Sequence, residues 1–253
     1  MLLLALLYLH GGGFSILLAL LLIPAAWEWG RLSGQTRIWP HFGYTLLLVI
    51  IFYVSRFIQV EWLLGAALVW WGSTLFWLRS FPGGTDWLFG SVASHLAGLL
   101  VLIPAWRSLE VIHQQEQGVE LLFFLLLLIW SADIGAYLVG RSFGSRKLAP
   151  NVSPGKSVEG LLGGVGFSLI FASTAYIYMG WSSMGLLLFL LAVVVMVLFS
   201  VVGDLVESTY KRSAGLKDSG NLIPGHGGIL DRMDSLTAAA PIFLSILIVS
   251  GGF

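Results

Sequence analysis

The sequence contains no cysteine and few charged residues. Among 253 residues, only 10% are Asp, Glu, Lys or Arg. Without Cys, the chain can form no disulfide framework, no thiolate metal site and no thiol nucleophile. A soluble domain carries roughly 25% charged residues, so this composition excludes a water-soluble enzyme and a disordered chain. Thirteen basic and thirteen acidic residues give a net charge of zero, which argues against a nucleic-acid partner.

Long apolar segments dominate what is present. Hydrophobic residues make up 57% of the chain, and a membrane-crossing helix needs about 20 mostly apolar residues. Lipid offers no partner for open strand edges, and the alternating segments of a β-barrel are absent. A first stretch, 1–9, can cross only about half of the hydrocarbon layer at ~1.5 Å per residue, so we expect a shortened first helix. Eight further segments predict helices: 14–27, 41–54, 62–78, 87–106, 119–139, 160–179, 184–202 and 236–249.

We therefore predict an all-α, polytopic integral membrane protein with about eight to nine transmembrane helices. It would form a single membrane domain, in which residues 1–120 are N-terminal helices and residues 121–253 are catalytic helices and loops. Basic residues gather in 31–40, in the loop after Gly140 and in 204–234, whereas 107–120 holds one Arg against three Glu. Even numbers of predicted helices separate the three basic stretches, so all three can face the cytoplasm.

Charged residues concentrate in two segments. Fifteen of the 26 charged residues lie in 133–159 and 204–234, seven of them acidic and eight basic. Membrane orientation explains Lys and Arg near the cytoplasmic face but does not require Asp. Mg²⁺ prefers carboxylates and phosphate oxygens, and phosphate groups prefer Lys, Arg and backbone N–H donors. Mixed clusters of this kind are typical of sites for divalent cations and polyphosphates.

The later cluster predicts a metal site built from two helices. A helix continuing past residue 202 would place Asp204, Glu207, Ser208 and Lys211 on one face. Asp231 and Asp234 are three residues apart, and Asp234 or Ser235 could cap the last helix. The Gly-rich segment 213–230 can fold back, so that Asp204 and Asp231 meet around a metal ion. The alternative is that both aspartates only cap helices and face solvent.

The earlier cluster predicts a phosphate site. Asp133 falls inside an apolar segment, where an ionised carboxylate costs several kcal/mol unless paired, and Tyr137 lies one turn later. Lys156 lies in a Ser-Pro-Gly-Lys-Ser turn that suits a phosphate group but lacks the P-loop pattern. A structural salt bridge at Asp133 and simple membrane orientation by Lys147, Arg141 and Arg146 are the alternatives. For Glu28, between two tryptophans, we expect a packing role.

Segment 208–234 resembles the bacterial phosphatidate cytidylyltransferases, or CDP-diacylglycerol synthases. It meets every fixed position of the signature S-x-x-K-R-x4-K-D-x-G-x2-[LI]-P-x-H-G-G-x-x-D-R-x-D. The runs 132–137, 153–156 and 26–30, together with Glu159-Gly160, also resemble this family. The resemblance covers nearly the whole chain and has high specificity, because the motif is long.

The resemblance implies a Mg²⁺-dependent transfer of CMP from CTP to phosphatidate, giving CDP-diacylglycerol and pyrophosphate. The reaction would take place at the cytoplasmic face of the bacterial inner membrane, and the enzyme could form a homodimer. One or two Mg²⁺ ions would bind Asp204 and Asp231. The remaining catalytic residues implied are Lys211, Lys217, Asp218, Arg232 and Asp234. The substrate-binding residues implied are Asp133, Tyr137, Lys147, Ser153, Lys156, Ser208, Arg212 and His226.

Two other functions stay open from the residues alone. A transporter of anionic metabolites would have its site near the bilayer midplane on repeated, broken helices. Here the charges gather toward one face, and the two halves show no convincing repeat. A membrane enzyme with another lipid acceptor, such as an isoprenoid lipid kinase, would share much of the same charge pattern.

Overall fold

A computed structural model describes residues 12–34, 37–83, 86–89, 91–181, 184–222, 225 and 227–252. The predicted half-helix at 1–9 and the predicted substrate residue His226 lie outside these residues. The described helices are α2 (Gly13–Leu32), α3 (Ile38–Ser55), α4 (Val60–Trp77), α5 (Ser91–His113), α6 (Gly118–Phe143), α7 (Val158–Met179), α8 (Leu186–Ser213) and α9 (Leu230–Ser250). Two short 3₁₀ helices, Leu78–Ser80 and Asp86–Phe89, lie between α4 and α5.

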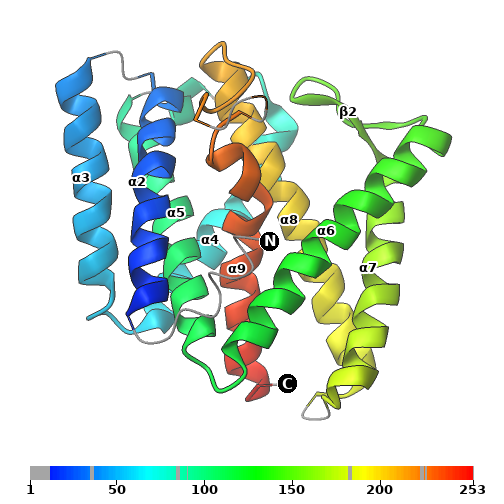
Figure 1. Ribbon diagram of the computed structural model, residues 1–253. Coiled ribbons are helices and arrows are strands. Elements are labelled where there is room, and N and C mark those ends of the chain that lie inside the picture. The colour runs from blue at the N-terminus through cyan, green and yellow to red at the C-terminus, as the bar shows by residue number, and fades with distance from the viewer. Residues whose placement is uncertain are drawn as a thin grey trace.

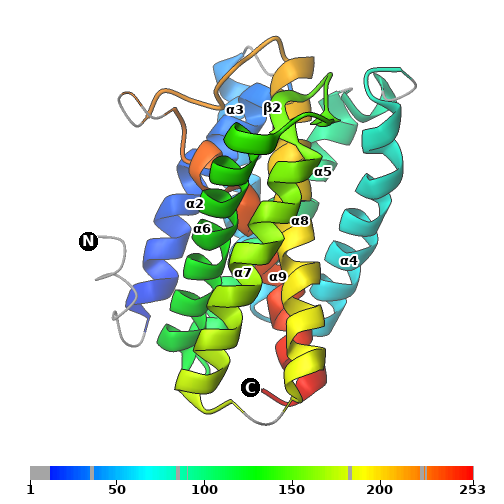
Figure 2. The same cartoon turned by 90° about the vertical axis from the view of Figure 1, so that its right-hand side faces the viewer.

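The eight helices run side by side along the height of the molecule (Figures 1 and 2). Seven of them are long and apolar enough to cross a membrane, and α4 falls outside this group. The prediction of an all-α, polytopic membrane protein is confirmed. Helix boundaries differ from the apolar segments because hydropathy marks only the apolar part of each helix, whereas the helices continue into more polar sequence at their ends. In particular, α8 continues eleven residues beyond the predicted 184–202 segment.

α9 is the central helix of the bundle. Nine consecutive residues, 236–244, are all buried, and α9 packs mainly against α8 and α5. Small residues make this close packing possible, since Ala238, Ala239 and Ala240 are fully buried. On the facing side of α8, a Cβ built on Gly203 would lie 2.6 Å from the backbone oxygen of Asp234. The absence of a side chain at Gly203 therefore brings the first turns of α9 against the polar part of α8.

The predicted basic loops lie together at one end of the bundle. The junction between α2 and α3, the connection between α6 and α7, and the segment between α8 and α9 all lie at the top of Figure 1, whereas the turn between α5 and α6 lies at the bottom. The α6–α7 connection contains an antiparallel hairpin, β1 (Lys147–Ala149) and β2 (Ser153–Ser157). The sequence predicts a loop here. We call this shared end the polar end.

α6 and α7 form the most extensive helix pair. Glycines line their contact: a Cβ on Gly163 would lie 2.4 Å from Val139 Cβ and 2.8 Å from the backbone oxygen of Gly135. In the same helix, Gly166 has open space where a Cβ would be. An added methyl group would therefore clash with α6 at Gly163 but would be accommodated at Gly166.

We expect Gly163→Ala to lower the free energy of unfolding by about 1–3 kcal/mol, the usual cost of overpacking. The matched Gly166→Ala should leave it unchanged or raise it by up to about 1 kcal/mol, because Ala favours the helix over Gly. Unfolding of both variants in mixed detergent micelles, followed by circular dichroism, measures the difference. Equal stability of the two variants would contradict the close α6–α7 contact.

Candidate active site

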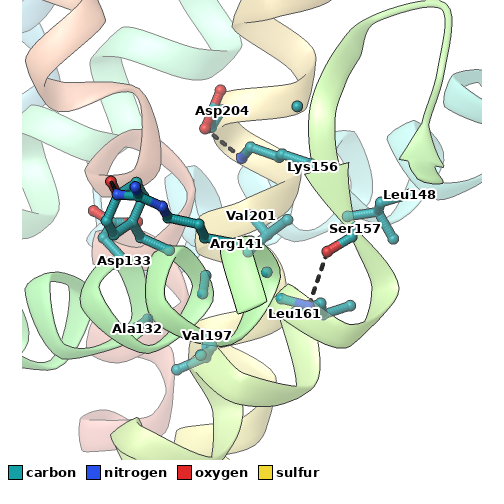
Figure 3. A pocket seen from close by; sticks show the side chains of 16 residues that line it. Ala132, Asp133, Arg141, Leu148, Lys156, Ser157, Leu161, Val197, Val201 and Asp204 are labelled. Atoms are coloured by element: carbon teal, nitrogen blue, oxygen red, sulfur yellow. Dashed lines mark hydrogen bonds and ion pairs between the residues drawn. The ribbon is translucent and has the colours of Figure 1, made fainter. Parts of the chain in front are cut away.

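A cavity of about 340 Å³ lies at the polar end, between α6, α7, α8 and β2 (Figure 3). Ala132, Ala136, Gly140, Gly160 and Gly164 line it from α6 and α7, so small residues leave the space open. Its polar lining consists of Asp133, Tyr137, Arg141, Lys156, Ser157 and Asp204. The cavity therefore combines an apolar floor with acidic and basic groups.

Asp204 and Lys156 form an ion pair across this cavity, between α8 and β2 (Figure 3). Ser208, one turn later on α8, donates a hydrogen bond of 3.1 Å to Asp204 Oδ1. Both members of the ion pair are about one quarter exposed, so a ligand in the cavity can reach them. The structure thus joins Lys156, Asp204 and Ser208, three residues that the sequence predicts as site residues.

Two further aspartates act on Asp204. The negative charge of Asp204 repels that of Asp133 on α6 and that of Asp234 on α9. Lys156 attracts both Asp133 and Asp234, and Lys211 also attracts Asp234. Carboxylates from three helices therefore interact electrostatically, and Lys156 offsets part of their negative charge.

A second cluster surrounds Asp231 in the first turn of α9. Lys211 Nζ donates a hydrogen bond of 2.7 Å to Asp231 Oδ1 and lies 3.3 Å from Glu207 Oε1. Asp231 Oδ2 accepts hydrogen bonds from Ser219 N (2.9 Å), Ser219 Oγ (2.9 Å) and Gly228 N (2.8 Å). Asp231 therefore fixes both ends of the 219–228 segment and ties α9 to α8.

Glu28 of α2 completes this cluster from the other half of the chain. Its carboxylate accepts hydrogen bonds from Ile229 N (3.0 Å), Leu230 N (2.8 Å) and Ser219 Oγ (3.0 Å). The expectation that Asp234 or Ser235 caps the last helix is wrong, because α9 begins at Leu230 and no side chain of its own segment caps it. The sequence analysis predicted a packing role for Glu28 and missed these hydrogen bonds. The available signal was the presence of an acidic residue in an apolar helix, which needs hydrogen-bond donors when buried.

Two glycines make room for the Glu28 carboxylate. A Cβ on Gly220 would lie 2.4 Å from Glu28 Oε1, and a Cβ on Gly228 would lie 2.5 Å from it. Any side chain at either position would displace the carboxylate. Glycines in segment 213–230 thus let the segment approach α2 closely, in addition to letting the chain reverse direction.

The other predicted residues lie around these two clusters. Arg212 Nε donates a hydrogen bond of 3.4 Å to the backbone oxygen of Val152 in the hairpin turn. Arg141 Nη1 donates a hydrogen bond of 2.8 Å to Tyr137 Oη. Glu159 binds Ser145 and Arg146 and so holds the start of the hairpin connection. Ser153 is half-buried in β2, and seven predicted residues are exposed: Asp133, Tyr137, Lys147, Arg212, Lys217, Asp218 and Arg232.

The carboxylates fit a metal ion that also binds a substrate. Within the described ranges, no group of three or more His, Cys, Asp or Glu side chains has the geometry of a metal site. Mg²⁺ usually takes one or two carboxylates and completes its shell with water and phosphate oxygens. Asp204 accepts bonds from Ser208 and Lys156 and keeps acceptor capacity, since a carboxylate has about four lone-pair sites. Asp231 has less, because it already accepts four bonds.

The chain is similar in sequence to known proteins along nearly its whole length. A sequence model of the cytidylyltransferase family matches residues 1–250. A phosphatidate cytidylyltransferase of Pseudomonas aeruginosa is 42% identical over 247 residues, which cover 96% of this chain and 90% of the relative. One of Haemophilus influenzae is 36% identical over 256 residues, covering 91% and 88%. One of Bacillus subtilis is 42% identical over 152 residues, covering 60% and 56%.

Proposed function

The chain belongs to the cytidylyltransferase family, and we propose on that premise that it transfers CMP from CTP to phosphatidate. The products are CDP-diacylglycerol and pyrophosphate. The observation that carries this proposal is similarity along nearly the whole chain to proteins named for this reaction. The membrane-spanning bundle with a charged cavity at one end supports it, because one substrate is a lipid and the other is a polyanion.

The chemistry needs charge compensation more than it needs a base. An oxygen of the phosphatidate phosphate attacks the α-phosphorus of CTP, and the bond between that phosphorus and the pyrophosphate oxygen breaks. The nucleophile is already ionised near neutral pH, so the main barrier is repulsion between two anions. Cationic side chains aimed at the phosphates lower this barrier by stabilising the developing charge. The proposed reaction requires no covalent enzyme intermediate.

Mg²⁺ is the proposed cofactor, one or two ions of it. Bound Mg²⁺ would neutralise triphosphate oxygens and the leaving pyrophosphate. Asp204 and Asp231 are the proposed ligands, with Asp218 and Asp234 as supporting acids. In the structure, Lys156 and Lys211 pair with these two carboxylates. Each lysine can exchange a carboxylate for a phosphate group when the charged nucleotide enters.

The basic residues divide between the two substrates. We assign Lys211, Arg212, Lys217 and Arg232 to CTP, because they surround the α8–α9 segment. Lys156 and Lys147 on the hairpin are assigned to the lipid phosphate, because the hairpin lies beside the cavity lined by α6, α7 and α8. Ser153, Ser208, Asp133 and Tyr137 complete the proposed substrate contacts, together with His226. The reaction needs no nucleic-acid partner, and a homodimer would leave each copy with its own site.

The proposed location is the bacterial inner membrane, with the polar end in the cytoplasm. The distribution of Lys and Arg supports this orientation. CTP is a cytoplasmic metabolite, and the polar end carries the cavity. The opposite end has its acidic excess in the turn between α5 and α6.

Purified protein in phosphatidate-containing vesicles, supplied with labelled CTP and Mg²⁺, should form lipid-linked CMP and an equal amount of pyrophosphate. Parallel vesicles should contain an isoprenoid alcohol in place of phosphatidate. Phosphorylated isoprenoid would indicate a lipid kinase, and uptake of CTP without new products would indicate a transporter. Either of these results would overturn the proposed function.

Asp204→Asn and Asp231→Asn should each leave less than about a tenth of wild-type turnover, because even losses around metal ligands cost roughly 10- to 100-fold. Chelation of divalent cations should abolish wild-type activity, and added Mg²⁺ should restore it. Glu116→Gln, an exposed acid at the opposite end, is the matched control and should retain full turnover. More than a tenth of wild-type turnover in either aspartate variant would refute its role as a ligand.

The absence of native cysteine allows a direct test of orientation. Ser213→Cys at the polar end and Gln115→Cys at the opposite end both replace exposed residues. A membrane-impermeant maleimide applied to spheroplasts should label Gln115→Cys at once and Ser213→Cys only after permeabilisation. The reverse pattern would place the polar end outside the cytoplasm and contradict the proposed orientation.

A further inference from the structure

We propose that Glu28 is a positioning residue for the reaction, an inference that takes the proposed function as given. From α2, its carboxylate holds the start of α9 and the turn at Ser219. These segments carry Asp231 and Asp234, two of the proposed acidic residues. Glu28 brings a carboxylate from the N-terminal half of the chain to the site.

The contacts of Glu28 bridge about 200 residues of sequence. Two backbone N–H groups, of Ile229 and Leu230, and one hydroxyl, of Ser219, donate to its two carboxylate oxygens at 2.8–3.0 Å. Ser219 also binds Asp231 through both its backbone N–H and its hydroxyl. Glu28 and Asp231 therefore share the single hydroxyl proton of Ser219, and a displacement of one carboxylate is transmitted to the other.

Charge and burial distinguish this arrangement from ordinary packing. Glu28 is 4% exposed, and its only described partners are backbone N–H groups and a hydroxyl. A buried carboxylate is costly unless it is well hydrogen-bonded. The start of a helix supplies unpaired N–H donors and partial positive charge, so Glu28 is the counter-charge for α9. A hydrophobic side chain could fill the space but could not bind these donors.

The rotation of α2 is fixed so that Glu28 faces α9. The neighbouring Trp29 is buried, its Nε1 donates a hydrogen bond of 2.8 Å to the backbone oxygen of Ser94 in α5, and its ring lies 5.0 Å from that of Tyr210 in α8. Trp27, on the other side, stacks on His41 of α3 with ring centroids 3.9 Å apart. The two tryptophans lock α2 to three other helices, which makes Glu28 a rigid support.

The matched control is Glu110, a second buried acid in the N-terminal half. It is 0% exposed and pairs with Arg56 and Arg107, each at 2.8 Å, at the end of the bundle away from the site. Substitution of Glu110 should affect stability without moving α9. Comparison of Glu28→Gln with Glu110→Gln therefore separates positioning from general destabilisation.

Three variants, Glu28→Ala, Glu28→Gln and Glu110→Gln, should be compared in phosphatidate vesicles with CTP and Mg²⁺. We expect Glu28→Ala to lower kcat about 100-fold, as small displacements of reacting groups do, while KM for CTP changes less than about threefold. Glu28→Gln keeps one acceptor oxygen and should restore part of the lost kcat. Glu110→Gln should lower Tm but keep kcat within about twofold of wild type.

Limited trypsinolysis gives a readout independent of activity. Lys217 is exposed in the segment that Glu28 holds, so cleavage after it should be about tenfold faster in Glu28→Gln and unchanged in Glu110→Gln, consistent with loss of a charged hydrogen bond. If Glu28→Ala does not fold, the isosteric Glu28→Gln decides the question. Normal kcat and normal cleavage in Glu28→Gln, beside an active wild type, would overturn the inference alone. An inactive wild type would instead overturn the proposed function.

Discussion

A buried acidic side chain in this apolar bundle is costly unless a donor or a cation from the chain itself pairs with it, because lipid provides none. At the polar end, these donors come from other segments of the chain. Asp204 joins α8 to the β-hairpin through Lys156, and Asp231 joins α9 to α8 through Lys211. Glu28 joins α2 to the first turn of α9. The requirement to satisfy three carboxylates thus determines how the helices meet around the cavity.

The same requirement prepares the site for its substrates. Lys156 and Lys211 neutralise the aspartates that we propose as Mg²⁺ ligands. A metal-bound nucleotide brings both positive ions for the carboxylates and phosphates for the lysines. The exchange conserves the number of ion pairs, so charged groups need not be left uncompensated inside the membrane at any stage.

The sequence was sufficient for the parts that depend on local pattern. Apolar length predicts the eight described helices, and charge predicts which loops share one end. Helical spacing places Asp204, Ser208 and Lys211 along the continuing α8. The sequence could not predict the cap of α9, because Glu28 lies about 200 residues away and only the packing of α2 brings it there. It also could not show that Asp231 holds the 219–228 segment, since backbone N–H donors leave no residue-specific signal. The sequence shows glycines at positions 163, 203, 220 and 228. It does not show which segments these glycines approach in the folded protein.

The central claim is that Asp204 and Asp231 bind the cation that carries the nucleotide. A crystal structure with Mn²⁺ and a non-hydrolysable CTP analogue tests it most directly, because the anomalous signal locates the ion. We expect oxygen atoms of both carboxylates at about 2.1 Å from an ion that also contacts the triphosphate, with Lys156 and Lys211 turned toward phosphate groups. An ion bound by phosphates alone, with both lysines still paired to their aspartates, would contradict it.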